Sequence, residues 1–230
     1  GGHSGIDIHE NRGNAVKLTA RTVFALKTIG ATLYTFDSGD KHNAIPREGI
    51  ATVVIPVEHV SRSREIISRH TAALQTEFPN EPSLQVTVRQ TAPPPRVLSK
   101  DSFTTVLNLL LAYHHGIIAM SREMEGLVET SNNLSSAHLR GDTILVHNTP
   151  RSSREQTLQS TIDQILAVSS LAGANSELED PYPGWQPNLQ SKILQLFEKT
   201  YQEIFGNYPE RVATHAGLEC GVIGNRCKGM

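Results

Sequence analysis

The sequence predicts an α+β fold, a two-layer sandwich in which amphipathic helices lie on one side of a sheet. Apolar residues recur at helical spacing in several segments, and segments with alternating apolar residues lie between them. Two of the predicted strands are joined by a short turn that contains glycine, which is typical of a hairpin. Helices and strands mixed in this way indicate the α+β class.

The first half of the chain begins with a predicted helix over residues 14–29. Val16, Ala20 and Val23 share one face of that helix, and Gly30 follows at the position where a left-handed residue is usual. The pattern then predicts an extended segment at 31–36, a long loop, a strand at 51–57, a helix at 61–74 and a strand at 84–88.

The prolines at positions 93–95 interrupt regular pairing and indicate a connector between two units. After them, Asp101 or Ser102 is predicted to cap an apolar helix that runs to about residue 115. The histidine pair at positions 114–115 would then lie at the helix end, where a histidine interacts favourably with the helix dipole.

A hairpin and two helices are predicted in the rest of the chain. The hairpin strands cover residues 127–139 and 143–148, and the RGD string between them is interpreted as the turn. Apolar residues then recur at helical spacing up to Gly173 and again up to Gly206.

The composition is that of a globular protein without a polyanionic or membrane partner. Hydrophobic residues make up 38% and charged residues 19%, and the net charge is -2 with no run of like charges. The longest apolar runs are far shorter than the roughly 20 residues that a bilayer requires. Two cysteines close together do not form a secreted disulfide framework, so a cytoplasmic location is expected.

Metal binding by the chain itself is not predicted. None of the ten histidines lies in an HExxH pattern, and Cys220 and Cys227 lack a second pair that would complete a tetrahedral site. The sequence therefore predicts no metal ligands among its own residues.

Four short strings carry groups suited to chemistry. They are GGHSG at residues 1–5, NAIPRE at 43–48, the pair His147 and Arg151, and HAGLECG at 215–221. Taken singly, each has a structural explanation: a flexible terminus, a proline turn, a strand end and a strand-to-loop transition. Only their order along one chain makes a functional interpretation the better one.

Together with GNA-x-K at residues 13–17, G-x-VETS-x-N at 126–133 and YPGWQP at 182–187, these strings resemble the aminoacyl-histidine dipeptidases. That family is also called cytosolic non-specific dipeptidase or Xaa-His dipeptidase, and it is grouped with peptidase T and carnosinase. The resemblance spans nearly the whole chain.

The resemblance implies a metallodipeptidase with a dinuclear zinc centre and a lid domain inserted into its catalytic domain. Residues 1–175 would be the lid and dimerisation domain, with ferredoxin-like βαββαβ elements and a break between two lobes near 92–100. Residues 176–230 would return to the catalytic domain. The zinc ligands and the general-base glutamate are expected outside these 230 residues, so the chain alone is expected to be inactive.

The resemblance also implies roles for individual residues. His3 would polarise the scissile carbonyl in the active site of the partner subunit of a homodimer, and Asn43 would contact the dipeptide near its carboxylate. Arg151 would bind the free C-terminal carboxylate, since a planar guanidinium can pair with both oxygens. His215 and Glu219 are expected to support the site from its border.

A non-enzymatic function remains open from the sequence alone. The chain could act as a lid-only module that dimerises, or that binds a small carboxylate without metal. The flanking coding sequence and a zinc-supplemented peptidase assay distinguish this hypothesis from the dipeptidase.

Overall fold

A computed structural model describes residues 1–179 and 188–211 of the chain, together with residues 215, 223 and 227. The α-helices are α1 (Ala15–Leu26), α2 (Val60–Glu77), α3 (Lys100–Ala112), α4 (Glu155–Leu171) and α5 (Lys192–Phe205). The strands are β1 (Gly2–His3), β2 (Thr32–Ser38), β3 (Ala44–Ile45), β4 (Gly49–Val54), β5 (Gly116–Met120), β6 (Val128–Arg140) and β7 (Thr143–Ser152). Short 3-10 turns are η1 (Ile8–Glu10), η2 (Lys27–Ile29) and η3 (Val57–His59).

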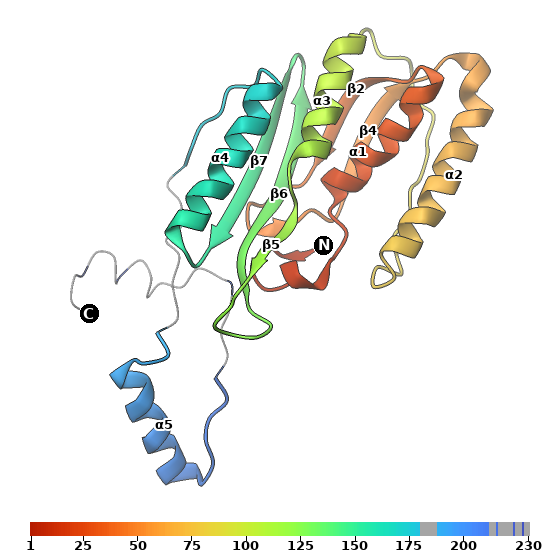
Figure 1. Cartoon of the computed structure of the whole chain (residues 1–230). Coiled ribbons are helices and arrows are strands. Elements are labelled where there is room, and N and C mark those ends of the chain that lie inside the picture. The colour runs from red at the N-terminus through yellow and green to blue at the C-terminus, as the bar shows by residue number, and fades with distance from the viewer. Residues whose placement is uncertain (180–187, 212–214, 216–222, 224–226, 228–230) are drawn as a thin grey trace.

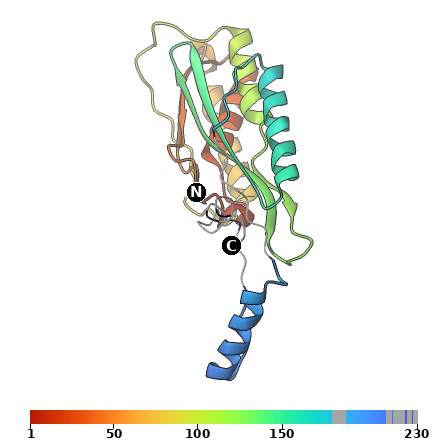
Figure 2. The same cartoon turned by 90° about the vertical axis from the view of Figure 1, so that its left-hand side faces the viewer.

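The central feature is a five-stranded antiparallel sheet built around β6. Along one edge β6 pairs with β7, and along the other it pairs with β5 near its start and with β2 near its end; β4 extends the sheet beyond β2. Helices α1 to α4 lie on one face of this sheet (Figures 1 and 2), and we call the opposite face the open face. The predicted two-layer sandwich of the α+β class is confirmed.

The largest core cluster is formed by α1 and α3 packing on β2 and β6. Phe36, Leu107 and Leu134 are fully buried in it, and burial of a side chain of this size contributes about 1.5–3 kcal/mol. The connector between α2 and α3 is tied to the sheet, because the amide of Leu98 donates to the carbonyl of Leu33 at 2.8 Å. Residues before and after that connector therefore share one core.

A bulge in β6 decides which of its residues reach the open face. The register against β7 shifts between Leu134 and Ser136. Leu134 and Ala137 both belong to the core cluster, although a regular strand would turn residues three apart to opposite faces. Before the bulge the side chains alternate regularly, so with Leu134 in the core, Ser131 and Asn133 lie on the open face.

The predicted strand at residues 84–88 is wrong, because this segment pairs with no strand of the sheet. Val86 packs instead against a small core cluster with Ile66 and Ile67 of α2. The carbonyl of Leu84 accepts a hydrogen bond from the Gln75 side chain of the same helix at 2.9 Å. The segment is thus held near α2 by Val86 and by the Leu84 carbonyl, while Val88 stays largely exposed.

Helix α3 begins earlier than predicted. Its N-cap is Ser99, not Asp101 or Ser102, because the Oγ of Ser99 accepts a hydrogen bond from the amide of Ser102 at 3.1 Å. Either residue type is a good N-cap, so the sequence could not choose between adjacent candidates.

Helix α3 also ends earlier than predicted, because a lysine from α1 occupies its C-terminal end. Nζ of Lys17 donates to the carbonyls of Leu110 and Leu111 at 2.9 Å each, where a cation interacts favourably with the helix dipole. Burial lowers the pKa of Lys17 to about 8. The ring of His115, predicted to lie at this helix end, contacts the side chain of Asn14 instead, with 3.1 Å between Nδ1 and Nδ2.

The predicted helix end at Gly30 and the predicted hairpin turn at Gly141 are confirmed. Both glycines have positive φ, 78° and 62° respectively, a conformation that residues with a Cβ rarely adopt. The helix predicted before Gly206 is also confirmed as α5, and none of its residues is buried.

Candidate functional site

The predicted site residues gather around the first half of β6. This strand contains an unusual run of buried polar side chains, each at most 1% exposed: Thr130, Ser131, Asn132, Asn133 and Ser135. Buried polar groups require hydrogen-bond partners. The partners of this run include the segments that carry the predicted site residues.

His3 is held in a defined tautomer. Its backbone pairs with Ala44 of β3, and its amide donates to Oδ2 of Asp7 at 2.7 Å. The amides of Gly5 and Ile6 both donate to Nδ1 of the His3 ring, each at 3.1 Å. Because Nδ1 is an acceptor, the neutral ring carries its proton on Nε2. The His3 side chain is therefore prepared to donate a hydrogen bond from Nε2.

Asn43 lies in the turn immediately before β3, and its side chain is exposed. The carbonyl of Asn43 accepts a hydrogen bond from the amide of Ser4 at 2.8 Å, which joins the turn to the segment after His3. Nδ2 of Asn133 donates to the carbonyls on either side of Asn43, to His42 at 3.3 Å and to Ala44 at 2.8 Å. The structure thus brings His3 and Asn43 together through the β1–β3 pair.

The same turn reaches the hairpin strand β7. The ring of His42 packs edge-to-face against that of His147, with 5.0 Å between the ring centroids and an interplanar angle of 82°. Burial, and then the neighbouring His42, lower the pKa of His147. Because His147 pairs with Ser136 after the bulge, this contact lies on the open face.

Arg151 lies on β7 directly opposite Ser131 of β6, so both side chains point toward the open face. Pro150 precedes it without interrupting the pairing with Asn132. Among the described strands β7 pairs only with β6, and an edge strand can accommodate a residue that lacks an amide hydrogen.

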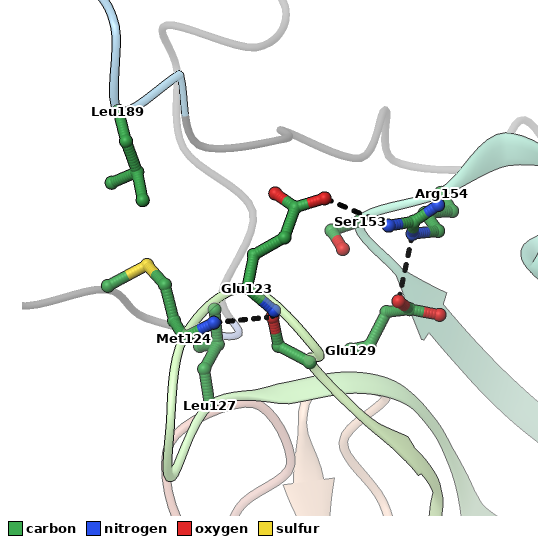
Figure 3. A pocket seen from close by; sticks show the side chains of 8 residues that line it. Glu123, Met124, Leu127, Glu129, Ser153, Arg154 and Leu189 are labelled. Atoms are coloured by element: carbon green, nitrogen blue, oxygen red, sulfur yellow. Dashed lines mark hydrogen bonds and ion pairs between the residues drawn. The ribbon is translucent and has the colours of Figure 1, made fainter.

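The chain beyond β7 is fixed by Arg154 (Figure 3). Its guanidinium forms ion pairs with Glu123 at 3.0 Å and with Glu129 at 2.9 Å. These residues and Leu189 line a shallow hollow in which both carboxylates are paired with the one guanidinium. We therefore interpret the hollow as structural: it anchors the end of the strand that carries Arg151.

His215 lies beside Arg151. Its Nε2 is 2.8 Å from Oγ of Ser131. Burial, and then the charge of Arg151, lower the pKa of His215 to about 4, against a smaller opposite effect of a hydrogen bond to the backbone of Val128. The ring is therefore neutral at neutral pH. Glu219, the other residue predicted at the border of the site, lies outside the described residues.

The structure groups the predicted residues in two pairs, His3 with Asn43 and Arg151 with His215. Asn133 bonds to the residues on either side of Asn43, and Ser131 bonds to His215. Asn133 and Ser131 are neighbours on the open face of β6, roughly 7 Å apart at strand spacing. Sequence reasoning did not identify either as part of the site. The available signal was a polar run, TSNN, inside a segment predicted as a strand.

A zinc centre does not fit the part of the chain that the structure describes. Within those residues, no three histidine, cysteine, aspartate or glutamate side chains are grouped so that they could hold a metal ion. The candidate site residues that the structure describes offer hydrogen-bond donors and the cation Arg151, which suit binding of a carbonyl and a carboxylate.

Known proteins resemble this chain in sequence and in fold. The chain is 33% identical over 225 residues to the cytosol non-specific dipeptidase of Escherichia coli strain K12, a match that covers 97% of the chain and 46% of that protein. Its fold matches the crystal structure of aminoacylhistidine dipeptidase from Vibrio alginolyticus with a TM-score of 0.91 and 34% identity. The predicted resemblance to the aminoacyl-histidine dipeptidases is confirmed.

The match to these dipeptidases covers nearly all of this chain but only part of each relative. The structural match covers 97% of the chain and 46% of the Vibrio protein, so the chain spans about half the length of the relatives it matches. No protein-family model matches it. Among the helices that the structure describes, none combines the length and the hydropathy needed to cross a bilayer.

Proposed function

We propose that this chain forms the substrate-binding part of a metallodipeptidase that hydrolyses Xaa-His and other dipeptides. The names of its relatives support the class of reaction. The observation that carries the proposal is the His3 ring, whose Nδ1 accepts two amide hydrogens, which leaves Nε2 as a donor. The backbone of His3 pairs with Ala44, next to Asn43.

In this proposal His3 acts on the scissile carbonyl. When the peptide carbon is attacked, its oxygen gains negative charge, and a donor already held at that position stabilises the transition state more than the ground state. Loss of one such donor reduces kcat about 10²–10³-fold. The amides of Gly5 and Ile6 contribute by keeping the ring in the donating tautomer.

Arg151 is proposed to bind the C-terminal carboxylate of the dipeptide, and Asn43 to contact the substrate near it. A guanidinium can pair with both carboxylate oxygens, which fixes direction as well as distance. His215 supports Arg151, because a neutral ring adds no competing charge and orders Ser131 opposite the arginine. A carboxylate site at a set distance from the reacting carbonyl restricts the enzyme to short substrates.

The remaining features follow the family resemblance. We propose that the complete protein uses zinc held by residues other than those described, and that the 230-residue chain alone binds no zinc and hydrolyses no dipeptide. Residues 1–175 would form the lid and the homodimer contact, so that His3 serves the partner's site. A cytosolic location is proposed, as the name of the Escherichia coli relative states for that protein.

An assay on two proteins tests the proposal. The product of the complete gene should hydrolyse Ala-His, lose activity with a chelator and regain it with zinc, and its His3→Ala variant should lose kcat about 10²–10³-fold with little change in KM. The 230-residue chain should show neither turnover nor bound zinc by metal analysis. A gene product without peptidase activity would refute the proposed dipeptidase function. Turnover and stoichiometric zinc in the 230-residue chain would refute the proposal that zinc binding requires residues outside it.

A further inference from the structure

Asn133 is buried in β6 but connects to the exposed turn that carries Asn43. Its side chain is 1% exposed, and its Nδ2 donates to the carbonyls of His42 and Ala44, the two neighbours of Asn43 in sequence. Ala44 in turn pairs with His3. One amide group therefore holds both predicted substrate contacts of the β1–β3 pair.

The orientation of this amide is determined by its surroundings. If Oδ1 and Nδ2 were exchanged, an oxygen would face two carbonyl oxygens, so only the donating orientation is compatible with these distances. In that orientation Oδ1 is buried without a hydrogen-bond partner among the described residues. A buried acceptor without a partner is unfavourable, so Asn133 does not optimise stability at this position.

Besides the hydrogen bonds from Asn133, the turn reaches the sheet through the ring contact of His42 with His147 on β7 and through apolar packing. β1 and β3 form a separate two-stranded pair, and Ile45 packs on Val128 in a small cluster. Among the described residues, the hydrogen bonds that connect this turn to β6 are the two donated by Asn133. Apolar packing allows sliding, whereas two directional bonds fix the turn laterally.

We propose that Asn133 is a positioning residue that sets the location of His3 and Asn43 relative to the carboxylate site on β7. It does not touch the substrate. Ser131, its neighbour on the open face, lies opposite Arg151, so a single strand carries the supports of both the His3–Asn43 pair and Arg151. The effect of Asn133 on catalysis rests on the proposed dipeptidase function, whereas its hold on the turn does not depend on that function.

Two substitutions separate positioning from folding. Asn133→Leu keeps the size of the side chain and removes both donors, and Asn133→Asp keeps the shape but places oxygens against the carbonyls. Asn108, exposed on α3, provides the matched controls Asn108→Leu and Asn108→Asp. Thermal unfolding is measured for all four variants, and rates are compared at a temperature where each is folded.

The kinetic test uses the product of the complete gene in a double-mutant cycle. Asn133→Leu should lower kcat on Ala-His at least about 10-fold in the wild-type background and less than about 3-fold in a His3→Ala background, because the ring that it positions is absent. The Asn108 variants should change kcat less than about 2-fold in both backgrounds. An equal loss from Asn133→Leu in both backgrounds would overturn the proposal, since a general structural defect does not depend on His3.

A second readout needs no activity. In the 230-residue chain, amide hydrogen exchange at Ser4, which donates to the Asn43 carbonyl, should accelerate at least about 10-fold in Asn133→Leu and not in Asn108→Leu. The ¹⁵N shifts of the His3 ring should move toward a mixture of tautomers. Unchanged exchange and shifts would overturn the positioning role, whereas an inactive gene product with changed exchange would refute only the dipeptidase.

Discussion

Asn14 connects the start of α1 to the sheet and to the end of α3, and its replacement should destabilise the fold measurably. Its Oδ1 accepts a hydrogen bond from the amide of Lys17 as the N-cap of α1, and its Nδ2 donates to the Leu134 carbonyl at 2.9 Å and contacts Nδ1 of His115 at 3.1 Å. Loss of the cap costs about 1 kcal/mol, and loss of two buried hydrogen bonds about 1 kcal/mol each. Asn14→Ala should therefore lower the free energy of unfolding by about 3 kcal/mol.

A comparison with Asn14→Ser divides this loss into its parts. Serine caps helices as well as asparagine does, but its short side chain cannot reach His115 or Leu134. The serine variant should therefore lose about 1 kcal/mol less than the alanine variant. Both values come from urea unfolding of the chain followed by circular dichroism and fluorescence, with coincident transitions required. Equal losses for serine and alanine, or losses below about 0.5 kcal/mol for both, would refute the reasoning.

Three further perturbations test other parts of the fold. Gly39→Ala should destabilise by about 2 kcal/mol or more in urea unfolding, because its φ is 76° and an added Cβ would lie 2.1 Å from the carbonyl oxygen of Ser135 in the β6 bulge; a wild-type midpoint would contradict the bulge. Stability should fall between pH 7 and pH 5, since burial first of all lowers the pKa of His115 to about 3 and of His215 to about 4. Below the ordinary pKa of about 6.5 the unfolded chain binds protons that the folded chain does not, which costs roughly 1 kcal/mol per pH unit for each ring, and a flat profile would contradict neutral buried rings. Arg154→Ala should lower the free energy of unfolding by only about 1 kcal/mol, because its ion pairs are partly exposed. A loss above about 3 kcal/mol would contradict this account of weak, solvent-screened ion pairs.

Local signals in the sequence predicted the elements well, because they depend on neighbouring residues. Gly30 and Gly206 end helices in the left-handed conformation, and the RGD string is the predicted turn. The predicted strand at residues 84–88 failed for a tertiary reason: alternation shows that one side is apolar but does not show whether a sheet edge is available. The prediction of where α3 ends was wrong for the same kind of reason, because Lys17 binds that end from a helix far away in the sequence.

The residues of the candidate site come from motifs and stay a prediction, and their arrangement could not be derived from the sequence. The motifs identified His3, Asn43 and Arg151, and the first two indeed lie together. Sequence reasoning did not identify Ser131 and Asn133, because polar residues in a strand normally face solvent. Here both are buried, Asn133 under the turn before β3 and Ser131 beside His215. Which polar residues of a strand are buried follows from long-range pairing, which no local pattern contains.

The central claim is that the open face of β6 and β7 recognises a dipeptide by its free carboxylate. The most direct measurement compares kcat/KM for Ala-His and for Ala-His amide in the product of the complete gene, in its Arg151→Gln variant and in Arg64→Gln, a control at an exposed arginine of α2. The wild-type and control proteins should prefer the free carboxylate at least about 100-fold, the value of two charge-assisted hydrogen bonds. Arg151→Gln should reduce the preference to a few-fold, mainly through KM. Equal use of the amide by the wild type, or an unchanged preference in Arg151→Gln, would contradict the account.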